Sequence, residues 1–265
     1  MKDQILSALS PDYPWKDAFH FYPEIGSTND QLKIMARQGA PHGTVLIADR
    51  QTGGHGRMGR SFHSPEGTGV YLSILLRPDC APGALMHLTC AAAVAMCEAL
   101  EAAAGIRPGI KWTNDLVFGK RKLGGILTEL GLNTRGMVDY AIIGIGINCC
   151  QKETDFPAEI RSIAGSLTMV SGKEIDRAKV AAAMMEALQK MDSVLLSGKA
   201  DMLECYRADC ITLGQDISLV RGEEIRHCHA VTVDDEGALV VLFPDGHLEA
   251  VNSGEVSVRG MYGYV

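Results

Sequence analysis

The chain has 265 residues, of which 46% are hydrophobic and 22% charged, so it can form one large or two modest domains with a buried core. Its net charge of −7 and pI near 5.6 argue against a general binder of nucleic acids or membrane surfaces, because such proteins are basic. The first twenty residues contain no apolar stretch typical of a signal peptide, and the longest strongly apolar run, residues 90–97, is too short to span a membrane. We therefore expect a cytoplasmic protein with no membrane partner.

The first predicted elements are a helix and two strands. The helix covers residues 27–39, because small capping side chains precede apolar residues at helical spacing and a glycine ends the pattern. Strands rich in β-branched and aliphatic residues are predicted over 44–49 and 70–76, with a glycine-rich loop between them. A long alanine-rich helix over 84–105 is apolar nearly all round, which indicates burial against a sheet.

Three more strands are predicted over 109–118, 122–130 and 138–148, and a short basic turn joins the first two. Helical periodicity returns from 174 to 209. Beyond residue 213, short alternating strands separated by turns predict a small antiparallel barrel. We therefore divide the chain into a larger domain, residues 1–212, and a small C-terminal domain, residues 213–265.

The glycine-rich loop, GGHGRMGRS, matches both the dinucleotide pattern G-x-G-x-x-G and a P-loop with arginine in place of lysine. Both motifs need a helix that starts inside the loop and holds a phosphate at its N-terminus. Pro65 and two further glycines follow, so no helix can start there. We interpret the segment as a loop between strands that carries Arg57 and Arg60.

Polar clusters stand at the ends of predicted elements. The sequence STN, residues 27–29, offers hydrogen-bonding side chains at a helix start, although helix capping alone would explain it. Lys111 lies in a strand that should be mostly buried, where an ammonium group needs a partner unless it reaches the edge. The basic turn 119–122 precedes a double glycine where backbone can approach a ligand. Together these clusters suit a phosphate-bearing ligand held over a sheet.

Other chemistries find less support. The pattern Gly-x-Ser-x-Gly is absent, and Cys149 and Cys150 lack a positioned base, so covalent catalysis by the protein is not indicated. The eight cysteines show no C-x-x-C spacing and are expected to be reduced. His227 and His229 share one strand face but have no further ligands nearby in sequence, and no protein metal site is predicted.

Five segments then resemble one family in order and spacing. They are STND, QTGGHGRMGRSFHSPEGTGVYLSILLRP, IKWTNDL, GKRKLGGILTEL and IIGIGIN, and they span about residues 20 to 150. The chain is similar there to biotin protein ligases, and its C-terminal segment resembles the small SH3-like domain of that family. The resemblance implies an α+β fold, with a mixed sheet and helices on one side as in class II synthetases, plus a C-terminal SH3-like β-barrel.

The resemblance also implies an activity. In the family, the biotin carboxylate attacks the α-phosphate of Mg-ATP, which gives biotinyl-5′-AMP and pyrophosphate. A lysine of a biotin carboxyl carrier protein domain, from acetyl-CoA carboxylase or another biotin-dependent carboxylase, then displaces AMP. The expected ligands are therefore biotin, ATP and Mg²⁺.

Site residues are carried over by position. The biotin site would comprise Ser27, Thr28, Asn29, Gln51, Gly54, His55, Gly56, Arg57, Lys111 and Gly125. The nucleotide site would comprise Arg57, Arg60, Trp112, Asn114, Lys122 and Asn148. Of these, Lys111 and Arg57 would be catalytic, because cations let two mutually repelling anions meet and stabilise charge on the α-phosphate.

Two positions depart from the family. His55 stands where arginine or lysine is common, so we expect a modest contribution from it. Thr113 stands where proline is usual, which adds a backbone N–H and should loosen the strand slightly. Only about twenty residues precede the STND segment, too few for the helix-turn-helix of relatives that act as repressors, so no DNA binding is expected. Sheet-edge dimers among relatives leave a homodimer open.

Two alternative functions remain at this stage. A lipoate or octanoate ligase shares the architecture and the adenylation chemistry, although Gln51 and the STN cluster favour a ligand head rich in N–H and C=O groups. A non-catalytic sensor of biotin or its adenylate would keep the binding residues without the reaction. The retained cations favour catalysis.

Overall fold

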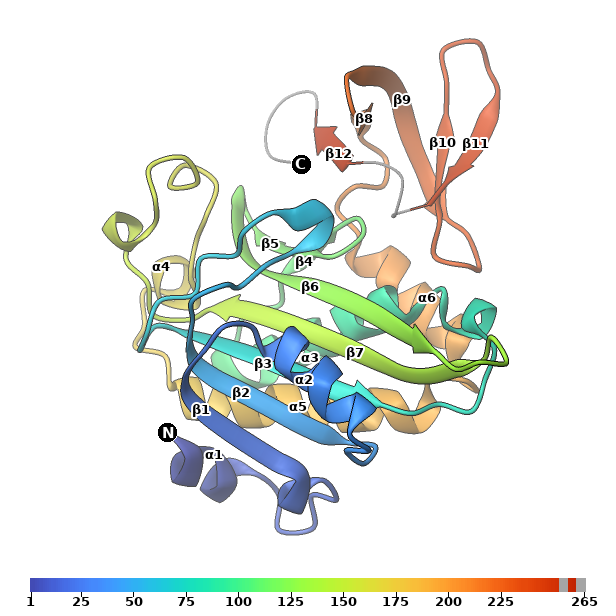
Figure 1. Cartoon of the computed structure of the whole chain (residues 1–265). Coiled ribbons are helices and arrows are strands. Elements are labelled where there is room, and N and C mark those ends of the chain that lie inside the picture. Colours follow the sequence, from blue (N-terminus) through green and yellow to red (C-terminus); the bar gives the residue numbers. More distant parts are fainter. Residues whose placement is uncertain (253–256, 261–265) are drawn as a thin grey trace.

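The computed structural model describes residues 1–252 and 257–260, and its larger part is built on a seven-stranded mixed sheet (Figure 1). The strand order is β1-β2-β3-β7-β6-β5-β4, in which β1 and β2 are parallel and the other neighbours are antiparallel. The strands are β1 (Phe19–Ile25), β2 (Thr44–Gln51), β3 (Gly69–Leu76), β4 (Gly109–Lys111), β5 (Asp115–Phe118), β6 (Arg121–Leu132) and β7 (Val138–Asn148). Every residue of the central strand β3 is buried, as expected for a strand covered on both faces.

Helices cover both faces of this sheet, which corrects the expectation of helices on one side. The helices are α1 (Lys2–Ala8), α2 (Thr28–Arg37), α3 (Leu88–Ala104), α4 (Leu167–Ser171), α5 (Arg177–Val194) and α6 (Lys199–Asp209). Alternate residues of β3 point to opposite faces. Leu72 and Ile74 join the large core with α3 and α5, whereas Leu75 packs with Leu32 and Ala36 of α2. The prediction is therefore right for α3 and α5 and wrong for α2, which lies on the other face (Figure 1).

The long helix α3 ends at Gly105, which adopts a left-handed conformation with φ of 68°. Residues 82–104 are long and apolar enough for a membrane span, with a mean hydropathy of 1.5, but 72% of that window is buried inside the protein. The helix packs against α5, α6 and the sheet, so its composition is that of a core helix.

Two predicted elements are interrupted. The predicted strand 109–118 is two strands, because Asn114 forms a turn whose side-chain amide donates to Ile126 O at 3.0 Å. The Trp112–Thr113 peptide in this turn is cis. The predicted helical region 174–209 is likewise two helices, α5 and α6, with a break before Gly198. The helix α1 and the strand β1 were not predicted.

Short 3-10 turns complete this part of the chain. They are η1 (Lys16–Ala18), η2 (Arg57–Gly59), η3 (Pro82–Leu85) and η4 (Glu153–Asp155).

The C-terminal part is a five-stranded antiparallel sheet of order β11-β10-β9-β8-β12. Its strands are β8 (Asp216–Arg221), β9 (Glu224–Val233), β10 (Leu239–Leu242), β11 (Leu248–Val251) and β12 (Ser257–Gly260). The predicted small β domain is thus confirmed, although residues 253–256 and 261–265 lie outside the described part of the chain. The indole Nε1 of Trp112 donates to Gly237 O at 3.1 Å and joins the two sheets.

Candidate functional site

A cavity of about 720 Å³ lies over the sheet face that carries α2. Its lining comes from the start of α2, the glycine-rich loop, strands β4 to β7 and the segment after η4, with Val258 from the C-terminal sheet. The predicted site residues that line it are Ser27, Thr28, Asn29, Gln51, His55, Gly56, Arg57, Arg60, Lys111, Trp112, Asn114, Lys122, Gly125 and Asn148. Segments distant in the sequence therefore meet at one cavity of ligand size.

Gly54 is the predicted residue that lies outside this lining. Its carbonyl accepts a hydrogen bond from Phe62 N at 2.9 Å, and a Cβ at this position would stand 2.8 Å from Ser64 Oγ and 2.9 Å from Gln51 Nε2. Glycine is thus required here for close packing of the loop against Gln51. Whether its backbone meets a ligand stays a prediction.

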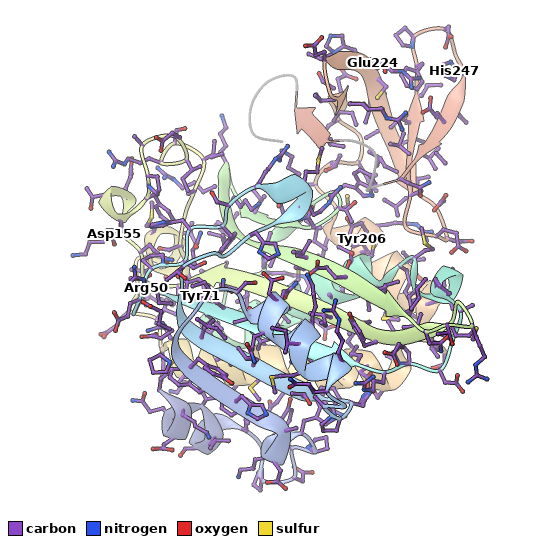
Figure 2. The ribbon with its side chains drawn as sticks, in the orientation of Figure 1. Arg50, Tyr71, Asp155, Tyr206, Glu224 and His247 are labelled. Atoms are coloured by element: carbon purple, nitrogen blue, oxygen red, sulfur yellow. The ribbon has the colours of Figure 1, made fainter. Side chains whose placement is uncertain are left out.

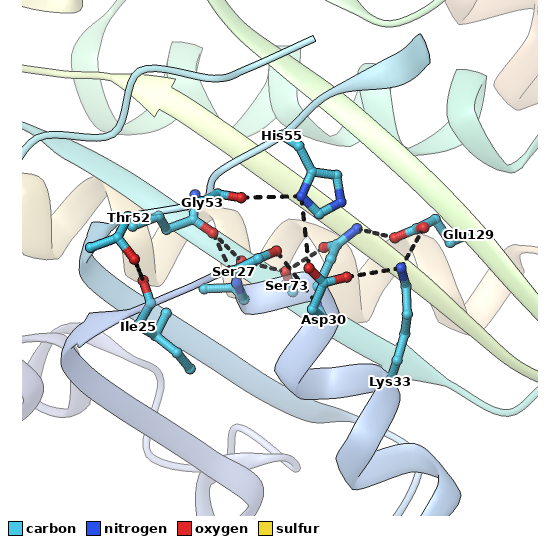
Figure 3. Close-up of polar contacts among 12 residues, drawn as sticks. Ile25, Ser27, Asp30, Lys33, Thr52, Gly53, His55, Ser73 and Glu129 are labelled. Atoms are coloured by element: carbon cyan, nitrogen blue, oxygen red, sulfur yellow. Dashed lines mark hydrogen bonds and ion pairs between the residues drawn. The ribbon is translucent and has the colours of Figure 1, made fainter. Parts of the chain in front are cut away.

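The end of the cavity near α2, here called the polar end, is a network of neutral side chains. Gln51 Oε1 accepts from Thr28 N at 2.9 Å and from Thr28 Oγ1 at 3.0 Å, and Gln51 Nε2 donates to Ser64 Oγ at 3.1 Å. Ser73 Oγ lies 2.7 Å from Thr28 Oγ1 and 2.6 Å from Asn29 Oδ1. Figure 3 shows Ser73 beside the start of α2, close to Ser27. Because these groups are buried or half-buried and bonded to one another, they hold fixed orientations.

Charged residues of α2 and β6 hold the amide side chain of Asn29. Its Nδ2 donates to Glu129 Oε2 at 2.8 Å, and the other oxygen of Glu129 lies 2.6 Å from Lys33 Nζ. Lys33 also pairs with Asp30 at 3.1 Å (Figure 3). A Cβ on Gly144 would stand 2.1 Å from Asn29 Oδ1, so the amide occupies space that only glycine leaves open. The amide of Asn29 is therefore fixed at both of its ends.

The glycine-rich loop, residues 52–64, crosses above the sheet. Gly56 N donates to Arg60 O at 2.7 Å and Phe62 N donates to Gly54 O, so the loop closes on itself as a small hairpin. Its one regular piece is η2, within which Met58 has a left-handed φ of 56°. No α-helix begins in these described residues, which confirms that neither phosphate-loop motif is formed.

Cations line the other end of the cavity, here called the cationic end. Arg57 donates to Asn114 Oδ1 at 3.0 Å, and burial lowers the pKa of its guanidinium while the carboxylate of Asp115 partly offsets this. Lys122 Nζ lies 2.5 Å from Asp115 Oδ1. Lys111 is only 7% exposed. A half-buried carboxylate among these cations keeps part of the positive charge compensated before a ligand enters.

The double glycine of β6 has two separate roles. A Cβ on Gly124 would stand 2.5 Å from Gly146 O on β7, so this glycine permits close packing of two strands. Gly125 lines the cavity beside Lys122, whose Nζ stands 3.4 Å from where a Cβ would be. The predicted close approach of a ligand therefore applies to Gly125.

Two predicted nucleotide residues have internal partners. Asn148 Nδ2 donates to Gly165 O at 2.9 Å, and its Oδ1 accepts from Gln151 Nε2 at 3.2 Å. Trp112 is 4% exposed, and its indole donates to Gly237 O in the turn between β9 and β10. Both residues line the cavity while they also fasten neighbouring segments.

Sequence reasoning missed one wall of the cavity. Residues 153–165, here called the wall segment, contribute Phe156, Ile160, Ile163 and Ala164 to the lining. Asp115 and His63 also line the cavity and were not selected. Asp115 could have been predicted from its position in the motif KWTND, residues 111–115. The apolar residues of the wall segment belong to no motif, so no sequence signal indicated them.

In the described part of the chain, possible metal ligands form no cluster of three and the cysteine thiols form no disulfide. Within residues 1–252 and 257–260, His, Cys, Asp and Glu form no group of three that could hold a metal ion. His229 pairs with Asp216 at 2.9 Å, and His227 contacts Ser218 at 3.0 Å. All eight cysteines are free thiols, as expected.

The mixed sheet, its cavity and the appended β domain define a class of protein. Residues 22–148 match the model of the Biotin/lipoate A/B protein ligase family, and residues 212–259 match the biotin protein ligase C terminal domain. The bifunctional ligase/repressor BirA of Bacillus spizizenii is 36% identical over 88% of this chain and 72% of its own length. The biotin–[acetyl-CoA-carboxylase] ligase of Mycobacterium tuberculosis is 29% identical over 97% of this chain and 93% of its own.

A solved structure agrees with these matches. The biotin protein ligase from Aquifex aeolicus in complex with biotin and ATP superposes with a TM-score of 0.78 at 31% identity, over 91% of this chain and 98% of that one. The chain therefore belongs to the biotin protein ligase family.

Proposed function

We propose that this protein is an ATP-dependent ligase that activates biotin to biotinyl-5′-AMP and transfers it to a lysine of a biotin carboxyl carrier domain. The observation that carries the proposal is a single cavity with a neutral polar end and a cationic end on one sheet face. The polar end suits the ureido ring of biotin, which has both N–H and C=O groups. The cationic end suits the carboxylate and the phosphates.

Activation requires two anions to meet. Lys111, Lys122 and Arg57 line the same cavity and would bring the biotin carboxylate to the α-phosphate, where they stabilise the charge that develops on its oxygens. Arg57, held by Asn114, would contribute a guanidinium to this end of the cavity. The carboxylate oxygen forms a bond to phosphorus as the bond to pyrophosphate breaks. A carrier lysine then attacks the acyl carbon and releases AMP.

Mg²⁺ enters this scheme as part of the Mg-ATP substrate. Mg²⁺ is commonly bound by one or two carboxylates together with substrate phosphates. The described residues offer no group of three acidic or imidazole ligands, and Asp115 is paired with Lys122. This donor set fits an ion carried mainly by the phosphates, whose charge it would neutralise.

The partners and the location follow as parts of the proposal. The carrier domain belongs to acetyl-CoA carboxylase or another biotin-dependent carboxylase, and the reaction takes place in the cytoplasm. The absence of DNA regulation and the homodimer stay predictions.

Lipoate and octanoate ligation is the alternative within the same family model. The network of Thr28, Asn29 and Gln51 argues for biotin, because a dithiolane or an aliphatic tail would leave those buried polar groups without ligand partners. The match to the biotin protein ligase C terminal domain supports the same choice.

Pyrophosphate exchange tests the proposal. The purified protein is incubated with ATP, Mg²⁺ and labelled pyrophosphate, and label in ATP is measured with biotin, lipoate or octanoate. We expect exchange with biotin alone among the three acids, and transfer of biotin to a purified carrier domain. Exchange with lipoate but not with biotin would establish the alternative, and binding of biotin without exchange would establish the sensor.

A further inference from the structure

The wall segment contributes little to the core of the protein. Phe156 and Ala164 are buried, but most of its other residues are exposed or half-buried. A segment with few buried apolar contacts owes its position mainly to specific hydrogen bonds. The residues that hold the wall segment in place therefore also shape the cavity.

Its C-terminal end is attached to the start of β6. Lys122 N donates to Ile163 O at 2.7 Å, and Gly165 N donates to Lys122 O at 2.9 Å. These bonds form an isolated bridge between Lys122 and Ala164. The same residue, Lys122, places its ammonium in the cavity, so the wall and the cationic end share one anchoring strand.

Arg121 adds side-chain bonds to the same attachment. Its NH1 donates to Ala164 O at 3.0 Å and to Arg161 O at 3.4 Å, and its NH2 lies 3.3 Å from Glu153 Oε2. A Cβ on Gly165 would stand 2.8 Å from Arg121 Cβ, so the two chains are in close contact. The planar guanidinium thus reaches both ends of the wall segment.

Arg121 itself does not line the cavity, whereas Ile160, Ile163 and Ala164 do. We propose that Arg121 is a positioning residue that holds the wall segment over the cationic end and thereby sets the affinity for the nucleotide. The proposal rests on the proposed function for the identity of that ligand. An adenine base is the flat, uncharged part of ATP and fits an apolar wall beside Lys122.

The kinetic test uses R121A and R121K. For R121A, we expect the KM for ATP in biotin-dependent pyrophosphate release to rise about tenfold, which corresponds to ~1.4 kcal/mol. The KM for biotin and kcat should stay within about twofold. R121K keeps the charge but cannot bond three acceptors in the same plane, so it should fall between wild type and R121A. R135A, which removes an exposed arginine from the turn between β6 and β7, is the matched control and should behave as wild type.

A second measurement needs no ligand. The wall segment contains Arg161, whose side chain donates to Phe156 O at 3.1 Å, so trypsin can report its accessibility. We expect cleavage after Arg161 to be several-fold faster in R121A than in R135A, at equal thermal stability of both. R121K, whose fold is less perturbed, repeats the comparison if R121A unfolds.

The outcomes separate the two claims. Wild-type ATP KM together with wild-type cleavage after Arg161 in R121A would overturn the positioning role, and so would a loss confined to kcat. If the wild-type protein itself releases no pyrophosphate with biotin, the proposed function fails, while faster cleavage in R121A would still support the attachment of the wall segment.

Discussion

At the polar end of the cavity, Thr28, Asn29, Gln51 and Ser73 bond to one another at 2.6 to 3.0 Å. At the cationic end, Arg57 on its loop reaches Asn114, and Lys122 reaches a carboxylate that also lines the cavity. The neutral groups are fixed by core elements before a ligand arrives, whereas the charges have internal partners that an anionic ligand can replace. Under the proposed function, recognition would use side chains bonded to one another, and charge stabilisation would use side chains whose internal partners a ligand can replace.

Removing a lysine from the cationic end should have the largest effect. We expect Lys122→Met and Lys111→Met each to lower kcat for pyrophosphate exchange by about 100-fold or more, because a preorganised group facing transition-state charge is typically worth that much. Lys190→Met, on an exposed side chain of α5, is the control. If either cavity variant retained a third of the wild-type rate, that lysine would have no role in the reaction.

Arg57→Ala should follow with a loss of about 50-fold in kcat/KM for ATP, since a permanent charge facing the phosphates is removed. Biotin binding without ATP, measured by calorimetry, should change by less than about threefold. A large loss of biotin affinity in this variant would show that the two ends are not separate in function.

At the polar end, Gly144→Ala should raise the KM for biotin about 20-fold. The new Cβ would overlap Asn29 Oδ1, displace the amide and leave its buried partners unsatisfied. The KM for ATP should change much less. Gly83→Ala, where a Cβ meets no atom within 4 Å, is the control. Equal effects on both substrates would contradict the division of the cavity.

His55→Ala should have the smallest effect, no more than about threefold on the exchange rate. The imidazole Nδ1 lies 3.2 Å from Gly53 O and 3.9 Å from Asp30 Oδ2, so it contacts the loop and α2 (Figure 3). An imidazole supplies less positive charge near neutral pH than arginine. A loss as large as that of Lys111→Met would refute this ranking.

The local pattern of the sequence was enough to predict most of the elements, and together with the family resemblance it identified about half of the cavity lining. The strands β2, β3, β6 and β7 have the expected composition, and short polar motifs mark where they end. Lys111 is predicted because it interrupts an apolar run, whereas Gln51 and Asn148 are predicted from the family resemblance, and all three line the cavity.

The features of the fold and the cavity that the sequence did not predict depend on tertiary contacts. β1 is identified by its parallel pairing with β2, and α2 takes the opposite face because Leu32 and Ala36 meet Leu75. The break between β4 and β5 follows from the bond of Asn114 to Ile126 on another strand. Ile160 and Ile163 become cavity residues only when the wall segment is fastened to β6. None of these relations is encoded in local periodicity.

Figure 2 shows Tyr206 deep in the molecule, below the C-terminal sheet, where its hydroxyl donates to Thr113 O at 3.0 Å. The indole of neighbouring Trp112 bonds to Gly237, and its backbone N–H bonds to Thr212 Oγ1 at 2.9 Å. Removal of strands β8 to β12 would leave the indole N–H of Trp112, next to Lys111 in sequence, without its acceptor Gly237 O. These bonds therefore couple the stability of the larger part of the chain to that of the C-terminal sheet.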